Sequence, residues 1–295
     1  MNLNNAKNLT VLITGASGGI GTYITREFIR RGANLALVAY PGAGLEDLKA
    51  EALKAGCKAI AHSSDLRENE QCHFVMDQVV KEFGGVDILI NNAGVEYTSF
   101  YHELREETVR SILRVNLEAP MILTWLALPY MLKKKSGFII NMSSLAGKSF
   151  PAYQEPYAAT KAGLVGFTSS LRATYGGTGV SASVICPGFV EAGIYERLKQ
   201  KTGFGAPITF GTSRPEAVVR AVIRAIEHNT PEIIVNPIPC RPLLATTALL
   251  PSLGEWMLRM MGAHKFFRRV RDAEAQPNTQ PAPSPAAVPA SSRSH

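Results

Sequence analysis

The chain has 295 residues, of which 46% are hydrophobic and 19% are charged. This balance excludes a disordered chain and suffices for one large α/β core. Its 25 glycines and 18 prolines follow no collagen-like period. The net charge of +7 is modest, and part of the excess lies between Arg241 and Glu274 rather than over the main body. We therefore expect no nucleic-acid partner.

The cysteines and the apolar runs exclude further classes. Cys57, Cys72, Cys186 and Cys240 form no CxxC pair, so they predict reduced thiols rather than a disulfide framework or a metal site. Residues 1–7 are polar, which argues against a secretory signal. Elsewhere no run reaches the roughly 18 apolar residues of a spanning helix. The predicted location is cytoplasmic.

Short apolar runs alternate with longer helical patterns along most of the chain. The runs predict strands at 9–14, 34–39, 57–62, 86–91, 137–142, 180–186 and 232–235. The helical patterns extend from the first glycine-rich segment to about residue 31, and over 45–55, 68–83, 103–132, 157–175 and 215–228. This alternation predicts an α/β fold: a single Rossmann-like, doubly wound parallel sheet of about seven strands, with helices on both faces.

The C-terminal part differs in composition from the rest. Residues 1–238 are predicted to form one domain, and 239–275 a helical C-terminal extension. Residues 276–295 are mostly Pro, Ala and Ser, which cannot bury enough apolar surface to offset backbone ordering. We therefore expect a disordered tail there.

A glycine-rich loop lies between the first predicted strand and the first predicted helix. It reads Thr14-Gly15-x-x-x-Gly19-x-Gly21, and its spacing differs from the GxGxxG of most dinucleotide-binding folds. Glycines let a phosphate approach backbone N–H groups, and the helix dipole favours the negative charge. The loop therefore predicts a pyrophosphate site, with an ordinary strand-to-helix turn as the alternative.

Several later motifs follow this loop in order. They are Asn91-Asn92-Ala93-Gly94, Asn116 within a helix, Ser144 after the fifth strand, Tyr157-x-x-x-Lys161, and Pro187-Gly188 after the sixth strand. Over residues 7–236 the chain resembles the short-chain dehydrogenase/reductase family. The resemblance implies that 1–238 is a dinucleotide-binding catalytic domain and that the chain is an NAD(P)-dependent oxidoreductase.

The candidate catalytic residues are Asn116, Ser144, Tyr157 and Lys161. Tyr157 and Lys161 are one helical turn apart and share a face, so the ammonium is expected to lower the phenol pKa by about two or three units. The resemblance implies that Tyr157 donates a proton to the substrate oxygen, that Ser144 holds that oxygen, and that Lys161 also bonds the nicotinamide ribose. It further implies that Asn116 supports a proton relay.

Alternatives exist at two of these positions. Ser143 is adjacent to Ser144, but the spacing to Tyr157 favours Ser144 and leaves Ser143 as a structural turn residue. Asn116 is unfavourable within a helix unless its amide is used, so a buried amide that bridges through water to Lys161 is expected. The alternative is an exposed helical asparagine.

The resemblance implies a larger set of cofactor contacts. These are Thr14, Gly15, Ser17, Gly18, Gly19, Ile20, Gly21, Tyr40, Asp65, Leu66, Asn92, Ala93, Gly94, Tyr157, Lys161, Pro187, Gly188 and Val190. Tyr40 is a candidate for packing near the adenosine or is simply a loop aromatic. Asp65 is either the adenine-contacting acid or a helix N-cap.

The identity of the nicotinamide cofactor is expected to depend on charge near the ribose. NAD-specific proteins carry an acid at the end of the second strand, whereas this chain has Ala39-Tyr40-Pro41 there and Gly18 before the second motif glycine. Because no carboxylate repels a 2′-phosphate, NADP is favoured and NAD is possible. Ala192 stands where the family often has a threonine, which removes one contact to the carboxamide.

Two segments after Gly188 bear on the substrate and partners. Residues 194–212 contain apolar side chains and several glycines, which predicts a mobile lid over a hydrophobic carbonyl or alcohol of lipid, steroid or acyl type. Residues 243–271 combine apolar and basic side chains, so they form either an interfacial membrane helix or a helix packed on the domain or a dimer partner. The resemblance suggests a homodimer or homotetramer.

Two other functions compete with the oxidoreductase. One is a catalytically silent dinucleotide-binding scaffold or sensor, suggested by the missing threonine and the missing cofactor-selecting charge. The other is a lyase or epimerase, which would call for a larger C-terminal substrate domain than this chain provides. The presence of all four candidate catalytic residues favours the oxidoreductase.

Overall fold

The computed structural model describes residues 1, 3, 6–42 and 44–275. The tail expected to be disordered, 276–295, lies outside these residues. Seven strands form one sheet in the order β3-β2-β1-β4-β5-β6-β7. The strands are β1 (Thr10–Thr14), β2 (Asn34–Ala39), β3 (Ala59–Ser63), β4 (Ile88–Asn91), β5 (Gly137–Met142), β6 (Val180–Pro187) and β7 (Glu232–Val235). Every pairing is parallel, so the predicted doubly wound α/β fold is confirmed.

Helices cover both faces of the sheet, which is why its central strands are apolar throughout. On one face α1 (Gly19–Arg30), α2 (Leu45–Lys54) and α9 (Pro215–His228) enclose a core that includes Val11, Ile13 and Phe28. On the other face α3 (Asn69–Phe83), α5 (Ala119–Lys134) and α7 (Glu155–Tyr175) pack on a core that includes Leu12 and Leu89. Alternate residues of β1 therefore point into different cores.

A buried polar chain crosses the sheet between β4 and β5. Asn91 donates to the side-chain oxygen of Asn141 at 2.9 Å, and Asn141 donates to Thr168 of α7 at 2.9 Å. Both amide nitrogens therefore have a buried acceptor, whereas the Asn91 amide oxygen has no hydrogen-bond partner among the described residues. This chain ties α7 to the two strands whose carboxyl ends flank the candidate site.

The helical region predicted at 103–132 consists of several pieces. A 3₁₀ turn (Tyr101–Glu103) precedes α4 (Glu106–Leu113), a π-helical turn (Arg114–Glu118) and α5. Within the described part of the chain, 106–134 is the one helical stretch whose length and hydropathy would allow a membrane span, and half of its apolar window is buried in the protein. Burial of that kind is typical of a core helix.

Two short helices were not predicted as such. α6 (Ala146–Ser149) follows β5, and α8 (Ile194–Thr202) occupies the first half of the predicted lid. β3 and β4 each start two residues after the predicted positions, a difference of the size expected at element ends.

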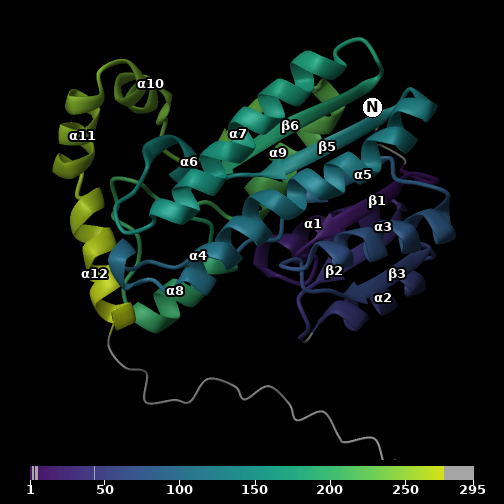
Figure 1. The fold of residues 1–295 in the computed structure, drawn as a ribbon, viewed down its shortest axis with the longest axis horizontal. Coiled ribbons are helices and arrows are strands. Elements are labelled where there is room, and N and C mark those ends of the chain that lie inside the picture. Colours follow the sequence, from purple (N-terminus) through teal and green to yellow (C-terminus); the bar gives the residue numbers. More distant parts are fainter. Residues whose placement is uncertain (2, 4–5, 43, 276–295) are drawn as a thin grey trace, which may run out of the picture.

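The C-terminal extension is helical over the residues described, as predicted. It contains α10 (Arg241–Leu249), α11 (Pro251–Met260) and α12 (Ala263–Ala275), which follow one another along one edge of the molecule (Figure 1). On α12 Phe266 and Val270 are buried against Tyr195 and Leu198 of α8. This half of the extension therefore packs on the domain, whereas α10 and α11 expose apolar side chains.

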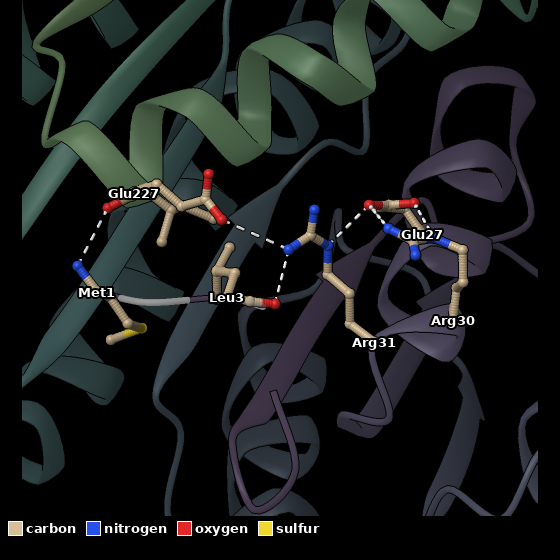
Figure 2. Close-up of polar contacts among 7 residues, drawn as sticks. Met1, Leu3, Glu27, Arg30, Arg31 and Glu227 are labelled. Carbon is tan, nitrogen blue, oxygen red and sulfur yellow. Dashed lines mark hydrogen bonds and ion pairs between the residues drawn. The ribbon is translucent and has the colours of Figure 1, made fainter. Parts of the chain in front are cut away.

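The N-terminal residues tie α1 to α9 (Figure 2). The Arg31 guanidinium donates to the Leu3 carbonyl oxygen at 2.6 Å and lies 3.5 Å from Glu227 of α9. Glu27 accepts from both Arg30 and Arg31, and the Arg30 hydrogen bond helps to lower the pKa of its carboxyl. The contacts of Arg31 with Leu3 and Glu227 therefore join elements that are remote in the sequence.

Candidate active site

The glycine loop is shaped by close backbone approaches. A Cβ at Gly21 would overlap the Gly15 carbonyl oxygen, and a Cβ at Gly19 would overlap the Gly193 backbone nitrogen. Gly15 itself has a φ of +64° and faces the Cα of Ala93. Space therefore requires glycine at Gly19 and Gly21, and both conformation and space require it at Gly15.

The loop leaves the first N–H groups of α1 open to a ligand. No side chain caps α1, and the N–H groups in the first turn of a helix have no intrahelical acceptor. Gly15, Gly18, Gly19 and Ile20 line a cavity of about 620 Å³. A pyrophosphate fits this place, because bare N–H groups and the positive end of the helix dipole favour an anion.

Residues after β4 hold the loop in position. The Asn92 amide donates to the carbonyl oxygens of Thr14 and Gly15, at 3.1 Å each. The Thr14 hydroxyl accepts from the N–H groups of Asn92 and Ala93 at 3.0 and 3.1 Å. Thr14 therefore shapes the loop from behind, while Asn92, Ala93 and Gly94 line the cavity.

The predicted catalytic side chains meet at one wall of the same cavity. Ser144, Tyr157 and Lys161 all line it. The Lys161 amine is 5.5 Å from the Tyr157 ring centre and donates to the Met142 carbonyl oxygen at 2.9 Å. Ser143, by contrast, donates to the Lys161 carbonyl oxygen at 2.7 Å, so its hydroxyl anchors α7 to the end of β5.

The expected effect of Lys161 on the Tyr157 pKa is corrected by the structure. Burial raises the pKa of Tyr157, and a hydrogen bond with Ser144 offsets this only in part. Burial also lowers the pKa of Lys161 to about 8. The reason is that enclosure disfavours both charged forms, while the amine is directed at a backbone carbonyl. The isolated protein therefore holds a neutral phenol.

Asn116 lies in the π-helical turn and is fully buried, so the exposed alternative is wrong. Its amide oxygen accepts the Val95 N–H and its amide nitrogen donates to the Val95 carbonyl oxygen, both at 2.8 Å. A Cβ placed on Gly94 would be 3.5 Å from both the Asn116 amide oxygen and the Lys161 amine. The two groups therefore converge on Gly94, although the water bridge between them stays a prediction.

Charged and aromatic groups gather beyond the end of β2. Arg67 donates to both carboxylate oxygens of Asp65, and its guanidinium carbon is 5.5 Å from the ring centre of the exposed Tyr40. Asp65 is not the N-cap of α3, because that helix begins at Asn69 and Glu68 precedes it. Sequence reasoning overlooked Arg67, although it stands only two residues after Asp65.

The remaining predicted contacts divide into two groups. Pro187, Gly188 and Val190 line the cavity where the chain leaves β6, beside Ala192. The candidates that do not line it are Thr14, Ser17, Gly21, Tyr40, Asp65, Leu66 and Asn116. Of these, Leu66 is a buried core residue.

The far end of the cavity is built by the lid and the extension. Tyr195 and Leu198 of α8 line it together with Leu243, Leu258 and Phe267 of the extension. Glu96 and Gln154 supply polar groups on this lining. These residues were not predicted as site residues. The extension does have an apolar pattern in its sequence. That pattern alone does not distinguish a helix that binds a membrane from one that packs on a partner or on the domain.

A doubly wound sheet with a glycine loop after β1 and a cavity at the carboxyl ends of its strands is the architecture of dinucleotide-binding enzymes. Comparison with known proteins names the class and the family. The short chain dehydrogenase family profile matches residues 9–203. The chain belongs to this family and is an NAD(P)-dependent oxidoreductase.

Individual relatives agree with this assignment. The chain is 39% identical over 265 residues to "Ketoacyl reductase HetN" of Nostoc sp.. The aligned segment covers 88% of this chain and 91% of that protein. It is 32% identical over 260 residues to human "17-beta-hydroxysteroid dehydrogenase 13", covering 87% and 84%. It is 31% identical over 215 residues to "3-oxoacyl-[acyl-carrier-protein] reductase FabG" of Thermotoga maritima, covering 72% and 87%.

Proposed function

We propose that the protein transfers a hydride between a nicotinamide cofactor and a carbonyl or secondary alcohol, with Ser144, Tyr157 and Lys161 as catalytic residues. The observation that supports this most is that the three side chains line the same cavity as the glycine loop. The bound nicotinamide would supply or accept the hydride. The protein residues would orient the carbonyl oxygen and provide its proton.

The protonation states suit the reductive direction. Burial keeps the Tyr157 phenol neutral, so it has a proton to donate to the oxygen that Ser144 holds. The pKa of Lys161 is about 8, so at pH 7 most of its amine is charged and would stabilise the phenolate as it forms. Asn116 would act as a positioning residue, because it fixes Val95 beside this group.

The test of this proposal is Tyr157→Phe, which removes the hydroxyl and keeps the ring. We expect nicotinamide binding to persist and turnover of a ketone panel to fall by about two orders of magnitude or more. Binding is measured by quenching of protein fluorescence and turnover by absorbance of the reduced nicotinamide. Full activity in this variant would refute the assignment. A wild-type protein that binds the nucleotide and reduces no ketone would favour the silent scaffold.

NADP is the proposed cofactor, with NAD possible. Arg67 supports this choice because it places a guanidinium beside Tyr40, just beyond β2, where a 2′-phosphate would lie. Arg67→Gln should weaken NADP binding about tenfold and change NAD binding by about twofold or less, since only NADP carries the extra phosphate. Arg220→Gln, on the exposed side of α9, is the matched control. Equal losses for both nucleotides would contradict the role of Arg67.

A hydrophobic carbonyl or alcohol of lipid, steroid or acyl type is the proposed substrate. The support is the lining of the far end of the cavity, where Leu198, Leu243, Leu258 and Phe267 lie. Such a cavity favours apolar ligands that bury most of their surface. A series of methyl ketones of increasing chain length should show kcat/KM rising with length. A flat series would contradict the proposal.

The protein is proposed to be cytoplasmic and to contact a membrane surface through apolar side chains of α10 and α11 and basic side chains of α12. Leu249, Trp256 and Met260 are 80%, 58% and 71% exposed, and the outer side of α12 carries Lys265, Arg268 and Arg269. Exposed apolar side chains next to basic ones suit an anionic lipid surface. Sedimentation with anionic vesicles should therefore weaken in a Leu249→Ser, Trp256→Ser, Met260→Ser variant. Unchanged sedimentation would rule out this face.

Self-association as a homodimer or homotetramer is proposed through α4 and α5. Leu113, Met121 and Trp125 are exposed on these helices, and large exposed apolar groups often mark protein interfaces. We also propose that residues 1–238 form the catalytic domain and that the extension begins at residue 239.

A further inference from the structure

Glu96 is a carboxyl group in the lining of the cavity. It follows β4 in the sequence Gly94-Val95-Glu96 and lines the cavity together with Gln154 and Tyr157. Val95, directly before it, is clamped by two hydrogen bonds to Asn116. The backbone that carries Glu96 is therefore fixed from the side of the catalytic group.

One oxygen of this carboxyl group is fully used by the protein. Oε1 of Glu96 accepts from the Thr98 hydroxyl and, at 2.5 Å, from the Gln154 amide nitrogen. The same amide nitrogen donates to the Thr98 hydroxyl at 3.0 Å. Within the described part of the chain, Oε2 has no hydrogen-bond partner in this network. A carboxyl proton would reside on Oε2, because both donors converge on Oε1.

The surroundings raise the pKa of this group above its ordinary value. Burial raises the pKa of Glu96, and the nearby Glu274 carboxylate of α12 raises it further, while Thr98, Gln154 and Lys201 act in the opposite direction. Glu274 accepts the Thr98 backbone N–H at 3.1 Å and lies 3.5 Å from Lys201 of α8. The extension therefore takes part directly in the environment of Glu96.

The loops that carry Glu96 and Gln154 contact each other and α12. The Ser99 N–H donates to the Tyr153 carbonyl oxygen at 3.0 Å, which joins the two loops. Arg271 of α12 lies against both Phe100 and Tyr153, with its guanidinium carbon 4.0 and 5.1 Å from the ring centres. Tyr153 has a φ of +67°, a strained conformation that persists only when its surroundings impose it.

We propose that Glu96 is a substrate-contacting, specificity-determining residue. Its free oxygen donates a hydrogen bond to a second oxygen atom of the substrate, a carbonyl or hydroxyl group a few bonds away from the carbonyl that is reduced. The substrate class is thus an apolar ketone with a neighbouring oxygen function, such as a 3-oxo ester or thioester. The inference rests on the proposed function, because Tyr157 and Ser144 set the position of the reacting carbonyl.

Two variants separate this role from a structural one. Glu96→Gln keeps the shape and, with its oxygen toward Thr98 and Gln154, presents an N–H where the protonated acid presents an O–H. Glu96→Leu keeps the approximate volume and removes the donor. The probes are ethyl 3-oxooctanoate and 2-octanone, of which only the first has a second oxygen function.

We expect Glu96→Leu to raise KM for the 3-oxo ester about tenfold and to change kcat/KM for 2-octanone by about twofold or less. Glu96→Gln should keep both substrates close to wild type. Equal losses on both substrates in Glu96→Leu would overturn the inference, and so would a Glu96→Gln variant as impaired as Glu96→Leu, since a charged acceptor would then be required. If wild type reduces neither ketone, the proposed function fails and this inference with it.

Nucleotide binding and thermal unfolding provide the control for folding. Each variant should bind NADPH like wild type, because Glu96 is not among the proposed cofactor contacts. If Glu96→Leu lowers the fraction of folded, nucleotide-binding protein, its comparison with Glu96→Gln is made by the ratio of kcat/KM values for the two ketones. That ratio cancels the fraction of active protein, and an unchanged ratio contradicts the proposal.

Discussion

Replacing Lys161 with methionine should change the pH dependence of stability by a predictable amount. The Lys161 side chain is buried, its amine has a backbone carbonyl as partner, and burial lowers its pKa from 10.5 to about 8. At pH 7 the folded protein therefore holds a charged amine at a cost of about 3 kcal/mol, at about 1.4 kcal/mol per pKa unit. Methionine has a similar length and no charge.

The sign of the pH effect follows from proton counting. Because the folded pKa is below the unfolded one, the unfolded chain binds more protons between about pH 8 and 10.5, and this group's contribution to stability rises with pH across that window. From pH 7 to 9.5 the wild type should gain about 2 kcal/mol relative to Lys161→Met. The variant should have lost its activity at every pH.

Urea unfolding of both proteins at pH 7, 8, 9 and 9.5 measures this difference. Subtracting one free energy of unfolding from the other cancels the titration of groups that both proteins share. Lys58→Met, at an exposed position after α2, is the matched control and should run parallel to wild type. A difference between wild type and Lys161→Met that stays constant over the range would refute the burial argument.

Two further predictions concern the loop and the lid. Gly19→Ala should weaken nicotinamide binding at least about tenfold, because its Cβ would overlap the Gly193 backbone; fluorescence titration checks this, and wild-type affinity would contradict it. Phe266→Ala should lower the free energy of unfolding by about 3 kcal/mol through loss of a buried ring. It should also raise KM for apolar ketones, because α8 loses its support. Unchanged KM would mean that α12 does not brace the lid.

The fold was predictable because its signals are local. The strands at 34–39, 137–142 and 232–235 and the helix at 215–228 were predicted with the boundaries that the structure has. Each apolar run there is bounded by glycine, proline or a polar residue, so the element has only one place to end. α6 and α8 were harder to predict, because four-residue and glycine-flanked helices carry little periodicity.

The convergence of Ser144, Tyr157 and Lys161 on one cavity was predictable for a different reason. Helical spacing places Tyr157 and Lys161 on one face, and the end of a parallel strand places Ser144 beside them. The pKa direction at Tyr157 was not predictable, because it depends on enclosure by segments distant in the sequence. The four-residue spacing indicates that the Lys161 ammonium lies near the Tyr157 phenol, but it carries no information about the burial that raises the phenol pKa.

Arg67 and Glu96 illustrate the same limit. The sequence does not indicate a role for Arg67, two positions after Asp65, because its contact with Tyr40 depends on the pairing of β2 with β3. The sequence indicates only that Glu96 is an acidic residue in the loop after a glycine motif. The structure shows that Thr98 and Gln154 both donate to one of its oxygens. Both roles arise from contacts between loops at the carboxyl edge of the sheet.

Different parts of the chain form different parts of the cavity lining. The glycine loop after β1, Ser144 after β5 and the proposed proton donor Tyr157 on α7 all lie within the 9–203 segment that the family profile matches. The far wall comes from α10, α11 and α12, outside that segment. Because Glu274 and Arg271 of α12 also contact the loops that hold Glu96 and Gln154, we expect a change in the extension to alter both the shape of the cavity and the surroundings of Glu96. Substrate choice can therefore change in this fold without any change to Ser144, Tyr157 or Lys161.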